Sequence, residues 1–206
     1  MLTCDQPKFM YFAPGKTGTR SLVNVFQRML KLPVYQLNGG THSHPTPEQL
    51  EERKDHAMLI TTRNPYSRAV SLWSHYKHKK PPANSVPTRV VMWQVTQSTT
   101  FRDWLEILKS REPVDWISHG HLHQHFFLDA MPRVDYRIRQ EHYAEDVLSL
   151  PFVPDTLELP KLNVSQYHKQ QAWQDYYKDP AVTELVRELW AKDLQVLGYD
   201  MDPLKG

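Results

Sequence analysis

A short loop rich in glycine, hydroxyl and basic residues, Pro14–Ser21, has the clearest chemical potential in the sequence. It joins an apolar run, Lys8–Ala13, to a segment whose apolar residues recur at helical spacing as far as Leu30, so we expect a strand, a tight loop and a helix. The start of a helix offers unpaired N–H groups and a partial positive charge, to which Lys16 and Arg20 add full charges. Further hydroxyl donors are Thr17, Thr19 and Ser21. The loop therefore predicts a site for a phosphate-like anion; the alternative is a basic surface turn.

A second segment of this kind is Arg63–Ser71. It follows an apolar run, Ala57–Thr62, that we expect to form a buried strand, and Asn64-Pro65 is typical of a helix start. The Arg63 guanidinium, at the end of the strand, can bind a phosphate through two parallel hydrogen bonds, although it could also pair with an acidic neighbour. The two segments together predict a ligand with two separated phosphate-like groups, one at each strand end.

Two departures argue against a magnesium-dependent ATP or GTP site. The nucleotide-binding pattern G-x-x-x-x-G-K-[ST] requires a glycine at the position of Met10. A carboxylate that holds magnesium is expected at the end of the second strand, but Thr62 leads directly into Arg63. The anion bound is therefore expected to be of another kind.

The loops need a sheet to position them. Pro33–Leu37 and Val134–Ile138 have the composition of further strands, and Ala181–Leu197 has the apolar spacing of a long helix. Strands that alternate with helices predict an α/β fold around a central, mostly parallel sheet. A chain of 206 residues fits a single domain over residues 1–206.

Composition excludes several classes of protein. Lys and Arg number 25 against 23 Asp and Glu, so the formal charge is only +2 and a nucleic-acid partner is not expected. The one cysteine, Cys4, excludes an intrachain disulfide and a cysteine-built metal site. No apolar run approaches the roughly 20 residues that span a bilayer, and no signal peptide is evident. We expect a soluble, cytoplasmic protein without a membrane partner.

The two anion-binding segments resemble the two motifs of sulfotransferases that use 3′-phosphoadenosine 5′-phosphosulfate (PAPS). The loop is similar to the family's 5′-phosphosulfate motif, P-K-x-G-T-T-S, with an inserted glycine and with Arg20 in place of a second threonine. Arg63–Ser71 matches the 3′-phosphate motif R-x-P-[YF]-x-R-x-x-S at every defined position. Similarity extends through Asp135–Glu141 and Asp193–Tyr199, so that it covers most of the chain. It looks closest to the carbohydrate sulfotransferase branch.

This resemblance implies a P-loop-like, three-layer fold and a transfer of the sulfuryl group from PAPS to a hydroxyl, with a carbohydrate as the expected acceptor. Lys16 would stabilise the leaving phosphate during in-line transfer, for which no metal is required. PAPS in the cytoplasm would suit a bacterial or viral enzyme. The residues carried over by motif are, for the 5′-phosphosulfate, Lys16, Thr17, Gly18, Thr19, Arg20 and Ser21, and for the 3′-phosphate, Arg63 and Ser71.

An acceptor hydroxyl must lose its proton, so a general base is expected near the loop. Histidine suits this role at neutral pH, and Thr41-His-Ser-His44 is similar to the H-x-H pattern of uronosyl 2-O-sulfotransferases. We expect His44 to be the base, assisted by His42, although the sequence leaves their order open. The fallback candidates are Glu48, Glu51 and Glu52.

Four histidines alternate along His119–His125, as they would on one face of a strand. Such a set could hold zinc, but neither a cysteine nor a close carboxylate other than Asp129 joins them, and the expected reaction needs no metal. The family often has His-x-x-Gln at this point, so we expect His121 and Gln124 to line the acceptor pocket, with an ordinary surface loop as the alternative.

Two other functions compete with a sulfotransferase. A nucleotide or small-molecule kinase predicts magnesium dependence and ATP binding. A catalytically silent nucleotide-binding module predicts ligand binding without transfer. The position sulfated on the acceptor and the oligomeric state are not determined by the sequence.

Overall fold

The computed structural model describes residues 1–37, 42, 44–82, 85, 87–97, 99–110, 122–159 and 171–205. These residues form two compact units. The first contains Met1–Arg63 and the described residues of 126–163, and it holds the sheet. The second contains Asn64–His125 and the described residues of 164–206, and it is helical.

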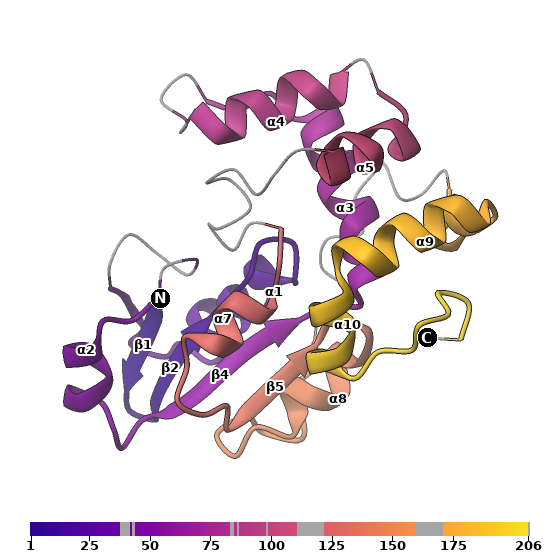
Figure 1. Cartoon of the computed structure of the whole chain (residues 1–206). Helices are drawn as coiled ribbons and strands as arrows, with labels where there is room; N and C mark the ends of the chain where they lie inside the picture. Colours follow the sequence, from indigo (N-terminus) through magenta and orange to yellow (C-terminus); the bar gives the residue numbers. More distant parts are fainter. Residues whose placement is uncertain are drawn as a thin grey trace. The chain divides into compact units, whose positions relative to one another are not determined.

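The first unit is built on a mixed sheet of five strands, counted over the described residues, in the order β3-β1-β2-β4-β5 (Figure 1). Strands β2, β4 and β5 are parallel, whereas β1 is antiparallel to both β2 and β3. Strand β1 therefore runs against the other four. The predicted α/β class is confirmed. The strands are β1 (Leu2–Asp5), β2 (Lys8–Phe12), β3 (Tyr35–Gln36), β4 (Ala57–Thr62) and β5 (Tyr136–Arg139).

Side chains alternate between the two faces of this sheet, as the pleat requires. On one face, Phe9 and Tyr11 of β2 are buried with Phe26, which follows helix α1. On the other, Met10 of β2 is buried with Phe127 of helix α7. Both faces are therefore apolar. The short helices of this unit are α1 (Thr19–Asn24), the π-helical turn η1 (Val25–Met29), α2 (Pro47–Glu52), the 3₁₀ turn η2 (Gln140–His142) and α8 (Tyr143–Leu148), with α7 (His125–Asp129) at the unit boundary.

The second unit begins where the sequence predicted a helix. The Asn64 side chain accepts a hydrogen bond from the Tyr66 N–H at 2.9 Å, and Pro65 occupies the first turn, so the expected cap is confirmed. The helices of this unit are α3 (Pro65–His78), α4 (Pro87–Gln97), α5 (Phe101–Ser110), the 3₁₀ turn η4 (Trp173–Tyr177), α9 (Pro180–Leu189) and α10 (Ala191–Leu197).

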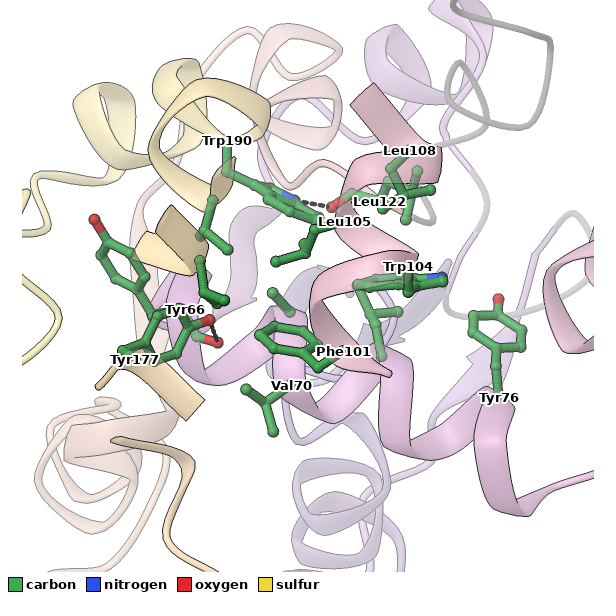
Figure 2. Close-up of a cluster of buried hydrophobic side chains, with 14 of the residues drawn as sticks. Tyr66, Val70, Tyr76, Phe101, Trp104, Leu105, Leu108, Leu122, Tyr177 and Trp190 are labelled. Atoms are coloured by element: carbon green, nitrogen blue, oxygen red, sulfur yellow. Dashed lines mark hydrogen bonds between the residues drawn. The ribbon is translucent and has the colours of Figure 1, made fainter. Parts of the chain in front are cut away.

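An aromatic core holds these helices together. Trp104 of α5 and Trp190, between α9 and α10, are fully buried, and their rings lie 6.4 Å apart. Figure 2 shows the Trp190 indole directed at the Leu122 carbonyl, to which its Nε1–H donates at 2.7 Å. The Tyr177 hydroxyl donates to the Tyr66 carbonyl at 2.8 Å in the same cluster. The Trp190 and Tyr177 donors therefore each have an acceptor, whereas Trp104 Nε1 donates to none among the described residues.

Several details of the fold differ from the sequence expectations, among them the strand expected at Pro33–Leu37, which is only Tyr35–Gln36. The predicted single helix over Ala181–Leu197 is two helices, because the backbone leaves helical geometry at Trp190. Strand β1 was not predicted, since its residues give too short an apolar pattern. The strand predicted at Val134–Ile138 begins at Tyr136. In the part of the chain that the structure describes, the helices are too short and too polar to cross a bilayer.

Leu105→Ala tests the aromatic core. The Leu105 side chain is fully buried in this cluster, so its truncation leaves a cavity and should lower the free energy of unfolding by about 2–5 kcal/mol. The control is Leu204→Ala, at a side chain that is 67% exposed, which should change it by no more than about 0.5 kcal/mol. Urea unfolding followed by tryptophan fluorescence measures both. Equal effects would contradict this assignment of the core.

Candidate active site

The loop between β2 and α1 has an unusual backbone. Lys16 has a φ of 70°, in the left-handed region that non-glycine residues rarely adopt, and Gly18 has a φ of 91°. A left-handed lysine costs roughly 1–2 kcal/mol and persists only where the surroundings enforce it. Left-handed residues in a tight turn direct backbone N–H groups into a concave, anion-binding arrangement. The loop thus has the backbone geometry expected of an anion site.

A run of N–H groups faces no acceptor in this loop. Among the described residues, the backbone N–H groups of Thr17, Gly18, Thr19 and Arg20 donate no hydrogen bond, whereas that of Ser21 donates to the Gly18 carbonyl at 3.0 Å. Four consecutive N–H groups at the start of α1, beside a lysine, can hold a tetrahedral oxyanion. The predicted anion loop therefore has the required donors in its backbone.

The hydroxyl of Thr17 is directed away from this run of donors. Thr17 is 1% exposed, and its Oγ1 donates to the Pro14 carbonyl at 2.7 Å and lies 2.8 Å from Thr61 Oγ1. Thr61 in turn lies 3.0 Å from the Tyr11 hydroxyl. Thr17 thus offers a ligand its N–H group but not its hydroxyl proton, contrary to the expectation that this hydroxyl is a donor.

Two side chains from other segments meet the loop. The Arg63 guanidinium, just beyond the end of β4, donates to the Lys16 backbone carbonyl at 3.4 Å, so the structure brings Arg63 against the loop. Gln140, just after β5, packs so closely on Gly18 that a Cβ there would overlap its Oε1. Gln140 was not predicted as a site residue. The sequence offered one indication of its role, because Gln140 lies within Asp135–Glu141, a segment similar in sequence to the family that the two anion-binding motifs resemble.

The two predicted base histidines lie in different surroundings within the first unit. His42 Nδ1 is 2.5 Å from the carbonyl oxygen of Ala13, the residue before the loop. Since a carbonyl only accepts, Nδ1 carries the proton, and in the neutral ring Nε2 is then free of its proton. The His44 ring packs on Phe127 with centroids 4.5 Å apart, and partial burial lowers the pKa of His44. His42 is therefore the histidine that contacts the loop's strand.

The fallback glutamates lie on helix α2, which begins with a capping box between Thr46 and Gln49. Their side chains are exposed, and two of them pair with neighbouring cations, as ordinary surface carboxylates do. These residues are Glu48, Glu51 and Glu52.

The remaining predicted site residues belong to the second unit or lie outside the described residues. Ser71 is 4% exposed, on helix α3. Gln124 is fully buried, and its backbone N–H donates to Asp193 at 2.8 Å. His121, with His119, lies outside the described residues. The expected strand is not present at the described end of the histidine run, because α7 begins at His125.

Asp193 is the anchor of this histidine segment. Its carboxylate accepts hydrogen bonds from the Gln124 N–H, from the His125 N–H at 2.9 Å and from His125 Nδ1 at 2.6 Å. Burial alone would raise the pKa of the Asp193 carboxyl, but His125, the nearby Arg68 and the backbone N–H groups hold it below its usual range. Arg68, fully buried, also donates to the Leu122 carbonyl. A buried charge cluster thus fixes Leu122–His125.

This cluster also has the composition of a metal site. His123, His125 and Asp193 each offer a ligand atom, and these atoms lie within 4.8 Å of one another. Burial lowers the pKa of His123 to about 4, so that its ring is neutral at pH 7. However, the Asp193 carboxylate already accepts three hydrogen bonds, and the Arg68 cation acts on both Asp193 and His123. These contacts explain the cluster as a structural one.

Gly18→Ala tests the special backbone of the loop. Alanine at a φ of 91° is strained and its Cβ would displace Gln140, so the free energy of unfolding should fall by about 1–2 kcal/mol. Gly15→Ala is the matched control, since a Cβ there meets nothing within 4 Å and should change it by no more than about 0.5 kcal/mol. Denaturant unfolding of both variants measures the difference. Identical denaturant midpoints for the two variants would show that Gly18 does not have a left-handed backbone packed against Gln140.

One of the comparisons with known proteins gives a match. A family model described as "Sulfotransferase family" matches residues 1–200. No curated protein and no solved structure is significantly similar to the chain. The family match runs through β2, the loop, Arg63 and Asp193, and stops six residues short of the last residue, Gly206. The chain therefore belongs to the sulfotransferase family.

Proposed function

We propose that this sulfotransferase moves the sulfuryl group of PAPS to a hydroxyl of a carbohydrate acceptor. The observation that carries the proposal is the loop itself, in which four N–H groups that donate no hydrogen bond among the described residues, Lys16 and the Arg63 guanidinium come together at the carboxyl ends of the parallel strands β2 and β4. Ligands of α/β sheets bind at the carboxyl ends of the strands. The family match supports sulfuryl transfer as the reaction class.

In this proposal the loop holds the 5′-phosphosulfate through residues Lys16 to Ser21. The acceptor oxygen attacks sulfur as the bond from sulfur to the bridging phosphate oxygen breaks, and the electron pair of that bond remains on the 5′-phosphate. Lys16 stabilises the charge that develops there, and the hydroxyl proton passes to a base. Positioning and charge neutralisation are sufficient for such a transfer, so no metal is required.

The 3′-phosphate is assigned to Arg63, whose fork of N–H donors suits a phosphate. Ser71, which the motif assigns to the same phosphate, belongs to the second unit, and its role stays a prediction, as does acceptor binding by His121 and Gln124. The family match spans residues of both units, which supports a single sulfotransferase domain of the P-loop-like, three-layer kind over residues 1–206.

We propose His42 rather than His44 as the general base. The contact of its Nδ1 with the Ala13 carbonyl holds the ring beside the start of the loop and leaves Nε2 able to accept a proton. His44 is packed on Phe127 and is proposed to assist. This reverses the order expected from the sequence.

A kinase fits the site less well. Met10 is a buried residue of β2, not a loop glycine, and Thr62 and Arg63 provide no carboxylate for magnesium at the end of β4. A silent binding module would bind PAP without transferring the sulfuryl group, and a transfer assay distinguishes it from an enzyme.

Titration with 3′-phosphoadenosine 5′-phosphate (PAP) tests the donor assignment. PAP without magnesium should raise the unfolding temperature, because a ligand that binds the native state stabilises it. Arg63→Ala should weaken PAP binding by about 10- to 100-fold, since a charge-assisted phosphate contact contributes about 1.5–3 kcal/mol. AMP, which lacks the 3′-phosphate, is the control ligand and should lose less affinity than PAP, since Arg63 acts on its 5′-phosphate only through the Lys16 carbonyl. Stabilisation by Mg-ATP alone would make the protein a kinase, and equal losses for PAP and AMP would remove Arg63 from the 3′-phosphate.

His42→Ala tests the assignment of the base. It should lower kcat by about 10²- to 10⁴-fold, the usual contribution of a general base, while PAP affinity is unchanged. His44→Ala should have the smaller effect. If His44 were the base, His44→Ala would have the larger effect on kcat. The acid limb of the plot of kcat against pH would then have its midpoint below the ordinary imidazole pKa of about 6.5, because burial lowers the pKa of His44. No effect of either variant would favour another base.

A further inference from the structure

Three buried hydroxyl groups form a continuous chain beneath the loop. Tyr11 on β2 and Thr61 on β4 lie 3.0 Å apart, Thr61 and Thr17 lie 2.8 Å apart, and Thr17 reaches the Pro14 carbonyl at 2.7 Å. Tyr11 and Thr61 are fully buried and Thr17 is 1% exposed, so water does not compete for these hydrogen bonds. The chain links two strands of the sheet to the first residue of the loop.

The direction of each hydrogen bond in the chain follows from proton counting. A carbonyl oxygen only accepts, so Thr17 donates its one hydroxyl proton to Pro14. Thr17 must then accept from Thr61. Because Thr61 donates its one hydroxyl proton to Thr17, it must accept from the Tyr11 hydroxyl. All three protons point toward the Pro14 carbonyl, and each hydroxyl between the ends both donates and accepts.

This chain acts on the part of the loop that is strained. It fixes both ends of the turn Pro14–Thr17, between which Lys16 has its left-handed φ of 70°. Such a conformation persists only if the surrounding contacts over-determine it. The chain also holds the Pro14 carbonyl against a hydroxyl, which keeps that partial negative charge engaged away from an incoming anion. Burial raises the pKa of the Tyr11 phenol, so the first donor keeps its proton.

We propose that Tyr11 and Thr61 are positioning residues for the donor, which act through Thr17 to hold the loop in its anion-binding shape. The assignment rests on the proposed function, because the anion it serves is the 5′-phosphosulfate of PAPS. Neither residue touches that ligand in the proposal. Tyr11 and Thr61 lie outside both sequence motifs, and the sheet register brings them beneath the loop.

Substitutions along the chain test this proposal through the affinity for PAP. Thr61→Val keeps the shape of the side chain but removes the donor to Thr17 and leaves the Tyr11 hydroxyl proton without an acceptor. It should therefore weaken PAP binding about tenfold. Thr61→Ser restores the hydroxyl and should bind within about twofold of the native protein. Tyr11→Phe leaves the hydrogen bonds from Thr61 to Thr17 and from Thr17 to Pro14 intact, so it should weaken PAP binding only about threefold.

Thr3→Val is the matched structural control. Thr3 is a fully buried threonine of the same sheet, and its hydroxyl donates to the Phe9 carbonyl at 3.1 Å. Its replacement should lower stability as Thr61→Val does but leave PAP affinity unchanged. Adenosine 3′-phosphate, which lacks the 5′-phosphate, should bind the native and Thr61→Val proteins equally. Equal PAP affinity of native and Thr61→Val proteins, or equal losses in Thr61→Val and Thr3→Val, would overturn the proposal.

Hydrogen exchange of the loop amides separates this proposal from the donor assignment. Thr61→Val should speed the exchange of the N–H groups of Ser21 and Leu22, which donate to the Gly18 carbonyl, about tenfold relative to the native and Thr3→Val proteins. A native protein that binds no PAP would refute the proposed donor, and the exchange rates would still decide whether the chain orders the loop. Unchanged exchange in Thr61→Val would refute that ordering, whatever the protein binds.

Discussion

The left-handed backbone of Lys16 is the constraint on which the first unit's site depends. A left-handed non-glycine residue costs roughly 1–2 kcal/mol, so it persists where surrounding contacts hold it. The Thr17 hydroxyl engages the Pro14 carbonyl from below, and Arg63 donates to the Lys16 carbonyl. Among the residues that the structure describes, the N–H groups of Thr17 to Arg20 have no acceptor. In the proposed function an anion accepts from these N–H groups, so the strained residues are the ones that bind the donor.

The second unit depends on a different buried charge. Asp193 is fully buried and ionised because His125, Arg68 and two backbone N–H groups compensate for the loss of water. The same contacts fix Leu122–His125, whose carbonyl at Leu122 accepts from both Arg68 and Trp190. A set of residues that resembles a zinc site in composition thus has a sufficient structural role.

Much of the fold was predictable because its signals are local. The strand at Ala57–Thr62, the asparagine cap at Asn64 and the strand-loop-helix unit around Lys16 follow from apolar period and capping chemistry within a few residues. The two motifs, read in order along the chain, also indicated the family that the match over residues 1–200 shows. The break at Trp190 was not predictable, since apolar spacing continues through it.

The sequence by itself determined which residues could bind an anion, whereas the tertiary structure decided how each is used. Thr17 was expected to donate to the ligand, but Thr61, 44 residues away, requires its hydroxyl to face inward. Gln140 meets Gly18 only because β5 pairs with β4, and Asp193 meets His125 across 68 residues. A helix cap and the spacing of apolar residues depend on neighbours in the chain. The direction of a buried hydroxyl depends on strand register, because each buried donor must find an acceptor wherever the sheet places one.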